Sequence, residues 1–219
     1  TVAHDLRAPL RNIQGYATAL LEDEAPRMSR DGLEYTQRLA ASAARLDGLI
    51  TDLLAYSRLA RMQLSCEPLA LEEIVEQVLQ DLSADIAAAG ARIAVDAPLP
   101  AVLGHRPTLV QALENLVANA VKFVAPGEAP SVDIGAVVAD GRVTVGVADR
   151  GIGIAPEHRA RIFDVFERLH GQEQYPGTGI GLAIVRKGVE RMGGRVSVQA
   201  RDGGGTRFEI ELPASGAPA

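Results

Sequence analysis

The chain has 219 residues, enough for one large domain or two small ones. Hydrophobic residues make up 47% and charged residues 23% of it, values typical of globular proteins. Its net charge of −6, without any block of basic residues, argues against direct binding to nucleic acid or to an anionic membrane surface.

The first 62 residues carry apolar side chains at the three-and-four-residue spacing of amphipathic helices. One predicted helix runs from Val2 to a break at residues 23–26. The second carries a stripe made of Leu39, Ala43, Leu46, Ile50, Leu53 and Leu54. A hairpin of about 60 residues cannot bury such a stripe by itself. The stripe therefore predicts that a second copy of the chain pairs with it in a four-helix bundle.

From about residue 64 the pattern changes to mixed helices and strands. Helices are predicted at residues 71–89, 107–123 and 182–192, and strands at residues 92–95, 132–138, 142–148, 195–200 and 206–212. Ala-Asp-Gly joins the second and third of these strands, which is typical of a hairpin. Hairpins mixed with helices favour an α/β sandwich in which the helices cover one face of the sheet. We expect a dimerisation domain at 1–63, a second domain at 64–213 and a flexible tail at 214–219.

The helix predicted at residues 107–123 carries a polar stripe on an otherwise apolar surface. Asn115, Asn119 and Lys122 in the segment ALENLVANAVKF lie at positions i, i+4 and i+7, so they share one face. A solvated face would have the same pattern. Amide oxygens are also hard ligands that suit Mg²⁺, and a lysine one turn further on can meet a phosphate group. The stripe is therefore a candidate site for a metal and a phosphate.

The segment DRGIGI follows the strand predicted at 142–148. Asp149 lies at the end of that strand, where its carboxylate can accept a hydrogen bond from the amino group of a base. Gly151 and Gly153 allow the backbone to approach a flat ligand closely. The pattern Asp-x-Gly-x-Gly also occurs in ordinary turns, so it indicates a binding site only together with other signals.

A second glycine-rich segment, PGTGIGL at residues 176–182, leads directly into a predicted helix. Glycines before a helix N-terminus expose free backbone N–H groups to an anion, and the helix dipole favours that charge. The segment does not match the dinucleotide fingerprint, because its third glycine comes one residue too soon and no strand precedes it. It also lacks the Walker pattern, so it predicts a different kind of nucleotide site.

The order and spacing of these motifs resemble those of the sensor histidine kinases of two-component signalling. NLVANAVKF resembles the asparagine box of that family, DRGIGI its first glycine box, FDVFERLH its phenylalanine box and GTGIGL its second glycine box. AHDLRAPL resembles the phosphoacceptor box, in the form often attached to phytochrome-like sensors. The resemblance extends from Val2 to Pro213. It implies an ATPase fold shared with heat-shock chaperones and type II topoisomerases.

The resemblance implies an Mg-ATP site in the second domain. Asn119 would hold Mg²⁺, with Asn115 beside it or sharing the metal, and Lys122 would face phosphate. Asp149 would bind the adenine amino group, with Thr206 near the base. The three glycines of the second glycine box would surround the phosphates. The further residues implied in nucleotide binding are Phe123, Gly151, Gly153, Phe166, Gly177, Thr178, Gly179, Gly181 and Leu182.

The resemblance also implies a mobile lid at residues 154–176. Phe163 and Phe166 in this segment would cover the nucleotide, or would only pack the lid's own short helix. Arg168 and His170 are candidates for phosphate contact, although a solvated surface position fits them equally well.

His4 would be the phosphorylated residue by the same resemblance. In the family this histidine takes the γ-phosphate of ATP, and neutral imidazole is mostly available near pH 7 because its unperturbed pKa is about 6.5. Asp5 would act as the base or orient the other ring nitrogen. This needs a particular rotamer, because adjacent residues on a helix do not face each other. The phosphate would then pass to an aspartate of a response regulator.

One position departs from the family pattern. Related bifunctional kinases carry threonine or asparagine four residues after the histidine, where the side chain is thought to hold the water that attacks the phosphorylated regulator. This chain has Ala8 there, whose methyl group can neither donate nor accept a hydrogen bond. We therefore expect weak or no phosphatase activity. Helix propensity also explains an alanine, with the water held by another group such as Asp5.

Two other functions are compatible with these motifs. An ATP-driven clamp of the chaperone or topoisomerase class would carry a glutamate base one turn before the metal asparagine. That position holds Asn115 here, and Glu114 lies one residue away, about 100° round the helix. A pseudokinase scaffold would dimerise and bind a partner without chemistry. The presence of every expected box favours the kinase over both.

Cysteine usage and hydropathy indicate the compartment. The one cysteine, Cys66, cannot form an internal disulfide, which fits a reducing environment. No apolar run is long enough to cross a bilayer and no signal peptide is visible. We expect a cytoplasmic fragment of a longer protein that is soluble or membrane-tethered as a whole, with a sensor domain before Thr1.

Overall fold

The structure, a computed structural model, describes residues 2–171 and 174–216, with residues 2–6 described by their backbone alone. The chain forms two compact units, Thr1–Arg58 and Leu59–Ala219. Across the described parts of both units, every helix is too short or too polar to cross a membrane. The two units are therefore described one after the other.

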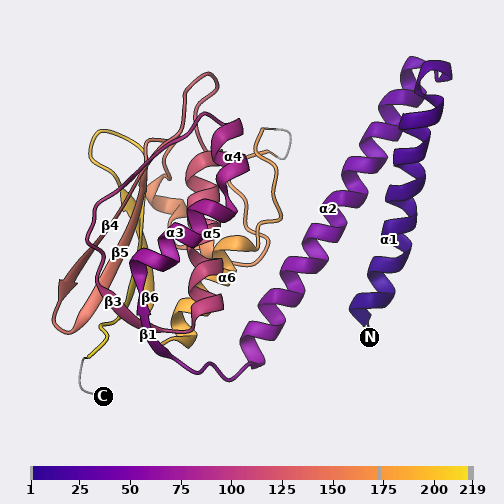
Figure 1. Ribbon diagram of the computed structural model, residues 1–219. Coiled ribbons are helices and arrows are strands. Elements are labelled where there is room, and N and C mark those ends of the chain that lie inside the picture. The colour runs from indigo at the N-terminus through magenta and orange to yellow at the C-terminus, as the bar shows by residue number, and fades with distance from the viewer. Residues whose placement is uncertain (1, 172–173, 217–219) are drawn as a thin grey trace. The chain divides into compact units, whose positions relative to one another are not determined.

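The first unit is a helical hairpin, as the sequence predicts. Its elements in chain order are α1 (Val2–Ala19), the π-helical turn η1 (Leu20–Glu24), the 3₁₀ turn η2 (Ala25–Arg27) and α2 (Arg30–Arg61), whose last turn belongs to the second unit. The predicted break at residues 23–26 falls within η1 and η2. The helices run side by side in opposite directions (Figure 1), and Arg7 Nη2 of α1 donates a 2.9 Å hydrogen bond to Thr51 Oγ1 of α2.

The hairpin leaves much of its apolar surface uncovered. Within it, Ala17 and Ala43 are buried. In contrast, Leu39, Leu46 and Leu53 of the predicted stripe are 49%, 45% and 46% exposed. Further exposed apolar side chains of this unit are Ile13, Tyr16, Leu20 and Tyr35. A two-helix hairpin has too little surface to bury both faces, so one apolar side has no covering element within the unit.

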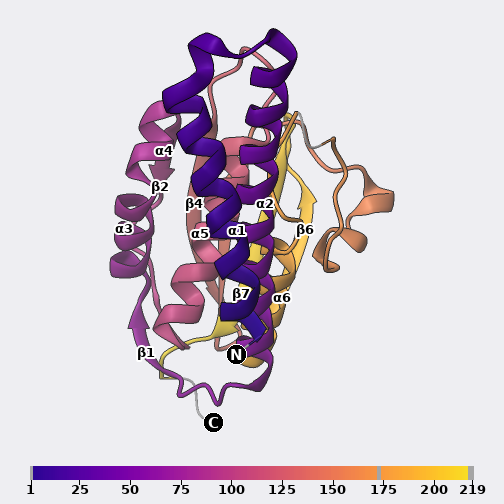
Figure 2. The ribbon, with the colours of Figure 1, turned by 90° about the vertical axis from the view of Figure 1, so that its right-hand side faces the viewer.

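The second unit contains a five-stranded sheet covered by helices on one face (Figures 1 and 2). The order of its strands is β2-β4-β5-β7-β6, and only β2 and β4 pair in parallel. The strands of this sheet are β2 (Arg92–Val95), β4 (Ser131–Ala139), β5 (Arg142–Asp149), β6 (Arg195–Ala200) and β7 (Thr206–Pro213). The helices are α3 (Leu71–Asp81), α4 (Ser83–Ala88), α5 (Arg106–Lys122) and α6 (Gly181–Arg191). This confirms the predicted α/β sandwich.

The core lies between the sheet and helices α3, α5 and α6. Alternate residues of β5 point into it because side chains on a strand alternate between faces. Helix α5 buries one whole face against the sheet. The core residues of these two elements are Val143, Val145, Val147, Leu109, Leu113, Leu116 and Val117. Because one face of α5 is fixed in the core, its other residues are held in a defined direction.

Two details of the second unit differ from the sequence-based expectation. The helix predicted at 71–89 is two helices, with Leu82 between them in a turn conformation (φ −92°, ψ 6°). Asp81 and Ser83 flank this break, and such residues compete with the helix for backbone hydrogen bonds. The sequence analysis also missed two short strands, β1 (Glu67–Ala70) and β3 (Ala101–Gly104), which pair antiparallel as a separate sheet. Their pairing partners are far apart in the sequence and Pro68 interrupts the strand pattern, so no local signal identifies them.

The end of the second unit is joined to β3. Ala214 forms a bridge with Val102, and the Ser215 N–H donates a 3.1 Å hydrogen bond to the Ala101 carbonyl. Ala214 also donates to the Gly141 carbonyl at 2.9 Å. The backbone is therefore hydrogen-bonded two residues beyond the end of β7.

The core assignment makes a stability prediction. Leu116 of α5 is fully buried, so Leu116→Ala should lower the free energy of unfolding by about 2–5 kcal/mol through lost burial and a cavity. Val137→Ala is the control, because Val137 is 60% exposed and should change stability by less than about 1 kcal/mol. Denaturant unfolding followed by circular dichroism measures both. Equal losses in the two variants would contradict the placement of α5 in the core.

Candidate functional site

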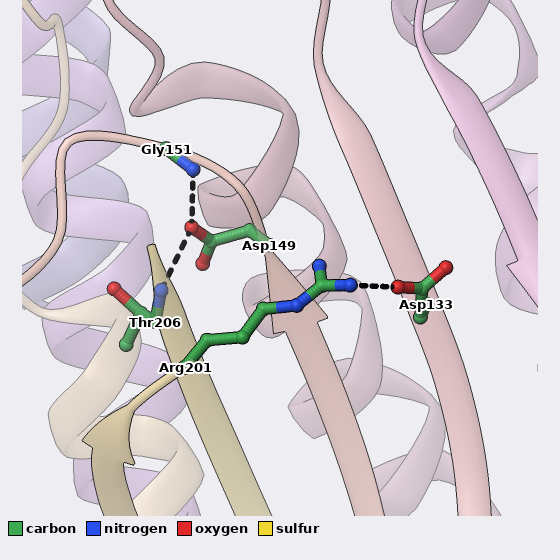
Figure 3. Close-up of polar contacts among 5 residues, drawn as sticks. All are labelled: Asp133, Asp149, Gly151, Arg201 and Thr206. Carbon is green, nitrogen blue, oxygen red and sulfur yellow. Dashed lines mark hydrogen bonds and ion pairs between the residues drawn. The ribbon is translucent and has the colours of Figure 1, made fainter. Parts of the chain in front are cut away.

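Asp149, the last residue of β5, is a buried carboxylate held by the backbone. Its Oδ1 accepts hydrogen bonds from the Gly151 N–H at 2.8 Å and the Thr206 N–H at 3.1 Å (Figure 3). Burial raises the pKa of Asp149 above its ordinary value, while the two N–H donors and the charge of Arg201 oppose that rise. Among the described residues no hydrogen bond reaches Oδ2, so a ligand can use this second oxygen.

The backbone after Asp149 is anchored against the end of α5. The Ile152 N–H donates a 3.0 Å hydrogen bond to the Phe123 carbonyl. A β-carbon at Gly151 would overlap that same carbonyl oxygen, so only glycine fits there. Gly205, at φ +96°, approaches from the other side, and a β-carbon there would overlap the Asp149 carbonyl oxygen. The glycines therefore allow three backbone segments to meet around Asp149.

The polar stripe of α5 faces the second glycine-rich segment. Asn115 Nδ2 donates a 2.8 Å hydrogen bond to the Gln111 carbonyl, and its Oδ1 lies where a β-carbon at Gly181 would be. A β-carbon at Gly177 would lie 3.3 Å from Lys122 Nζ. Asn119 lies between these two positions on the helix, and its side chain is half-buried. The predicted stripe and the predicted phosphate loop are therefore in contact.

Lys122 lies in a partly buried, positively charged environment. Burial lowers the pKa of its ammonium group, and the neighbouring charge of Arg168 lowers it further. Its Nζ also lies 4.3 Å from the centre of the Phe123 ring. Two cations side by side favour an anion between or near them.

The glycine-rich segment leads into α6 as predicted. Gly179 is in the left-handed region at φ +76°, and Thr178 Oγ1 accepts a 3.3 Å hydrogen bond from the Ile180 N–H. Helix α6 then begins at Gly181, and Leu182 packs against the core. The first N–H groups of a helix have no intrahelical acceptor, so the start of α6 offers donors to an anion near Asn115, which lies beside Gly181.

The segment between β5 and α6 stands out from the rest of the second unit (Figure 2). It contains two 3₁₀ turns, η3 (Pro156–His158) and η4 (Arg161–Phe163). Phe163 is buried and meets the Phe208 ring edge-on at 6.3 Å, so it packs the core. Phe166 is 58% exposed, and its N–H donates a 2.9 Å hydrogen bond to the Gly179 carbonyl. The two phenylalanines therefore have different environments, and only Phe166 lies open beside the glycine-rich segment.

Arg168, a candidate for phosphate contact, donates hydrogen bonds to two backbone carbonyls. Its Nη2 donates to the Tyr175 carbonyl at 2.8 Å, and its Nη1 donates to the Gly177 carbonyl. These contacts fix the guanidinium at the start of the glycine-rich segment. Its charge still acts there, as its effect on Lys122 indicates.

Tyr175 is a site residue that the sequence analysis missed. It is buried at 6% exposure, and its hydroxyl donates a 2.7 Å hydrogen bond to the Val124 carbonyl. Its ring lies 5.0 Å from the Phe123 ring and 5.4 Å from the His170 ring. In the sequence, the only feature that could have pointed to Tyr175 is its position directly before Pro-Gly. Tyr175 joins the glycine-rich segment to the end of α5.

Glu114 is a half-buried carboxyl group of α5. Burial and the carboxylate of Asp81, at the end of α3, raise its pKa. Glu114 is therefore influenced by α3, although it directly precedes Asn115. Within the described residues no three His, Cys, Asp or Glu side chains gather to hold a metal ion.

His4 and Asp5 lie in α1, but their side chains are outside the described residues. Ala8 lies one turn further along the same helix and is half-buried. The helical backbone is the one that the spacing of the first segment predicts.

Comparison with known proteins identifies both units. Residues 104–216 match the family of histidine kinase-, DNA gyrase B-, and HSP90-like ATPases, and residues 1–61 match the His Kinase A (phospho-acceptor) domain. The chain is 36% identical over 214 residues to cyanobacterial phytochrome A of a Nostoc species and 32% identical over 223 residues to the histidine protein kinase DivJ of Caulobacter vibrioides. These alignments cover 98% and 99% of this chain but only 28% and 37% of those relatives.

Solved structures agree with the sequence comparison. A crystal structure of full-length ShkA in complex with AMPPNP superposes with a TM-score of 0.73 at 36% identity, covering 100% of this chain and 46% of that one. The catalytic domain of the histidine kinase ThkA superposes with a TM-score of 0.60 at 28% identity over 69% of this chain and 97% of that one. The chain belongs to the histidine kinase-, DNA gyrase B-, and HSP90-like ATPases and, with its phosphoacceptor domain, to the sensor histidine kinases of two-component signalling.

Proposed function

We propose that this chain is the core of a histidine autokinase, which transfers the γ-phosphate of ATP to His4 and then to a response regulator. The observation that supports this best is the meeting of Asp149, the polar stripe of α5 and the glycine-rich segment in one place, in a chain that begins with a phosphoacceptor domain. Dimerisation and phosphotransfer would be assigned to residues 1–63, and ATP binding to residues 64–213.

The adenine would bind at the buried end of β5. Asp149 Oδ1 is occupied by two backbone donors, which leaves Oδ2 to accept a hydrogen bond from the adenine amino group. Thr206 is adjacent to this carboxylate and would lie near the base, with Gly151 and Gly153 allowing close approach. Phe123 would border the adenine site, since its carbonyl anchors the turn after Asp149.

The phosphates would lie between α5 and the start of α6. Lys122 would meet them together with the backbone of Gly177, Thr178, Gly179 and Gly181. Phe166, exposed beside Gly179, would cover the nucleotide, while Leu182 would support the loop from the core. Burial removes part of the hydration of the Lys122 ammonium group, which lowers its pKa. A phosphate group would supply an anionic partner to this cation.

Mg²⁺ fits the donors of the stripe. The amide group of Asn115 is oriented by its bond to Gln111, so its oxygen faces the glycine-rich segment, and Asn119 is one turn further on. Because the described residues form no acidic or histidine cluster, the metal would be held by these amide oxygens together with phosphate oxygens. When bound, Mg²⁺ neutralises phosphate charge.

Phosphoryl transfer would form a bond between a ring nitrogen of His4 and the γ-phosphorus while the bond to the bridging oxygen breaks. ADP leaves with that electron pair. Asp5 would take the proton or orient the imidazole by accepting a hydrogen bond from its other ring nitrogen. We propose that a second copy of the chain covers the exposed apolar side chains of the first unit and so forms a dimer.

The clamp mechanism of the chaperone and topoisomerase class has less support. It requires a glutamate one helical turn before the metal asparagine, but that position holds Asn115, and Glu114 lies about 100° round the helix from it. The autokinase and the pseudokinase scaffold then remain. Only the autokinase gives the phosphoacceptor domain a chemical role.

The His4 assignment is tested by His4→Gln. This variant should lose detectable autophosphorylation while its ATP affinity stays within about twofold of the parent, since ATP binds in the other unit. Incubation with γ-labelled ATP and isothermal titration calorimetry measure the two quantities. His105→Gln, at the junction of β3 and α5, is the control and should keep the label. Retained labelling of His4→Gln would move the acceptor to another residue.

The adenine assignment is tested by Asp149→Asn, which keeps an oxygen for the Gly151 and Thr206 donors but replaces the free acceptor by an amide. ATP and ADP should both bind about 10- to 100-fold more weakly. Asn119→Ala should remove chiefly the Mg²⁺-dependent part of ATP binding. Asp85→Asn on the exposed surface of α4 should change neither.

The difference in ATP affinity between the parent and Asp149→Asn should depend on pH. The ionised carboxylate accepts the hydrogen bond from adenine more strongly than the protonated group, so the extra affinity is present above the pKa of Asp149 and is lost as the pH falls through that value. Because burial raises this pKa, the advantage of the parent over Asp149→Asn should shrink at a pH above that at which an ordinary aspartate protonates. A constant ratio of the two affinities down to the ordinary range would contradict the proposed role.

The activity toward the regulator is tested at Ala8. We propose that the parent transfers phosphate efficiently but dephosphorylates the regulator weakly, because Ala8 cannot hold a water molecule. The decay of a phosphorylated cognate regulator should be unchanged by the parent and accelerated by Ala8→Thr. Ala19→Thr, at the exposed far end of α1, is the control and should have no effect. Marked acceleration by the parent would refute this part of the proposal.

A further inference from the structure

A cation spans the sheet beside Asp149. Arg201 follows β6 at one edge of the sheet, and its Nη2 binds the carboxylate of Asp133 in β4. Strands β7 and β5 lie between these two strands in the sheet order. Figure 3 shows the Arg201 side chain passing close to Asp149 on its way to Asp133. The ion pair therefore crosses the end of the strand that carries Asp149.

Arg201 is well enclosed, while its partner is not. The side chain of Arg201 is 18% exposed and that of Asp133 is 48% exposed. Arg201 Nη1 is buried and makes no hydrogen bond to any described residue. A guanidinium that is shielded from water on one side and paired to a solvated carboxylate on the other keeps a large part of its field inside the protein. Burial raises the pKa of Asp149; its two backbone N–H donors oppose that rise, and the charge of Arg201 opposes it less than they do.

The turn that carries Arg201 also carries a donor to Asp149. The Gly204 N–H donates to the Arg201 carbonyl at 3.1 Å, and the Arg201 N–H donates to the Gly205 carbonyl at 3.3 Å. The next residue, Thr206, gives its N–H to Asp149 Oδ1. Gly203, Gly204 and Gly205 all have φ between +84° and +101°, so the turn has little intrinsic preference for this form. The bond from Arg201 to Asp133 holds one end of the turn to the far strand β4.

Asp133 is placed to receive this cation. It pairs in register with Ala148, the residue before Asp149, so it lies one strand away from the adenine-binding end of β5. Asp133 therefore binds Arg201 from β4, whereas Asp149 belongs to the neighbouring strand β5. Since paired residues share a face and neighbouring residues alternate, Asp133 lies on the sheet face opposite to that of Asp149.

We propose that Arg201, held by Asp133, is a positioning residue for adenine recognition: it fixes the turn whose Thr206 N–H holds Asp149 in place to accept the adenine amino group. This inference rests on the proposed ATP site. Arg201 would touch no part of the nucleotide, and its effect would pass through Asp149 alone. Because the effect would pass through the acceptor of the amino group, it would be specific for a base that carries one.

The test compares ATP with purine riboside triphosphate, which lacks the amino group, by calorimetry on the whole chain. The parent should prefer ATP, and Arg201→Gln should reduce that preference about three- to tenfold while binding of the analogue stays within about twofold. Arg201→Lys keeps the charge and should restore part of the preference. Arg195→Gln, at the exposed start of β6, is the control and should keep all of it.

A second comparison separates this role from simple support of the fold. In an Asp149→Asn background, Arg201→Gln should cause no further loss of ATP affinity, because the group through which it acts is gone. Equal weakening of ATP and the analogue, or additive losses in the double variant, would overturn the inference, and so would an unchanged preference in Arg201→Gln. A parent that binds the two nucleotides equally would instead overturn the adenine site itself.

Discussion

The buried carboxylate of Asp149 is the interaction on which the candidate site depends. Two backbone donors from opposite directions, Gly151 and Thr206, reach one of its oxygens. These bonds bring the turn after β5 and the start of β7 to the same point. A buried carboxylate is costly unless hydrogen-bonded, so the two donors offset its desolvation and also fix its orientation. The free oxygen is then directed by the fold, before any ligand binds, which lowers the ordering cost of recognition.

Helix α5 connects this carboxylate to the rest of the site. Its apolar face packs in the core, so the opposite face, from Asn115 to Phe123, is held rigidly against the second glycine-rich segment. The Phe123 carbonyl receives the turn after Asp149, and Tyr175 joins the glycine-rich segment to the same helix end. The proposed base site and the proposed phosphate site therefore share one support. Substitutions in the core face of α5 should consequently weaken both nucleotide contacts together.

The sequence predicted the elements whose signals are local. The alternation of β4 and β5, the apolar face of α5 and the glycines before α6 each lie within one short segment, so their positions agree with the structure to within about two residues. Other features had no local signal. The pairing of β1 with β3 and the Arg201–Asp133 ion pair join residues far apart in the chain. The break at Leu82 depends on a small difference in stability between a continued helix and a turn. Tyr175 lies in a segment without helical or strand periodicity, so the sequence offered no reason to assign it a role. Phe163 packs in the core and Phe166 does not, a difference that depends on tertiary contacts and therefore cannot be read from the local sequence.

We propose that this chain moves the γ-phosphate of ATP onto a histidine. The most direct measurement is the chemical stability of the phosphoryl group formed when the protein is incubated with γ-labelled ATP. A phosphorus–nitrogen bond is labile in acid and stable in base, whereas a phosphate ester of serine or threonine is stable in acid. A histidine kinase should form label that is lost in acid and retained in base. Label that survives acid would contradict this activity.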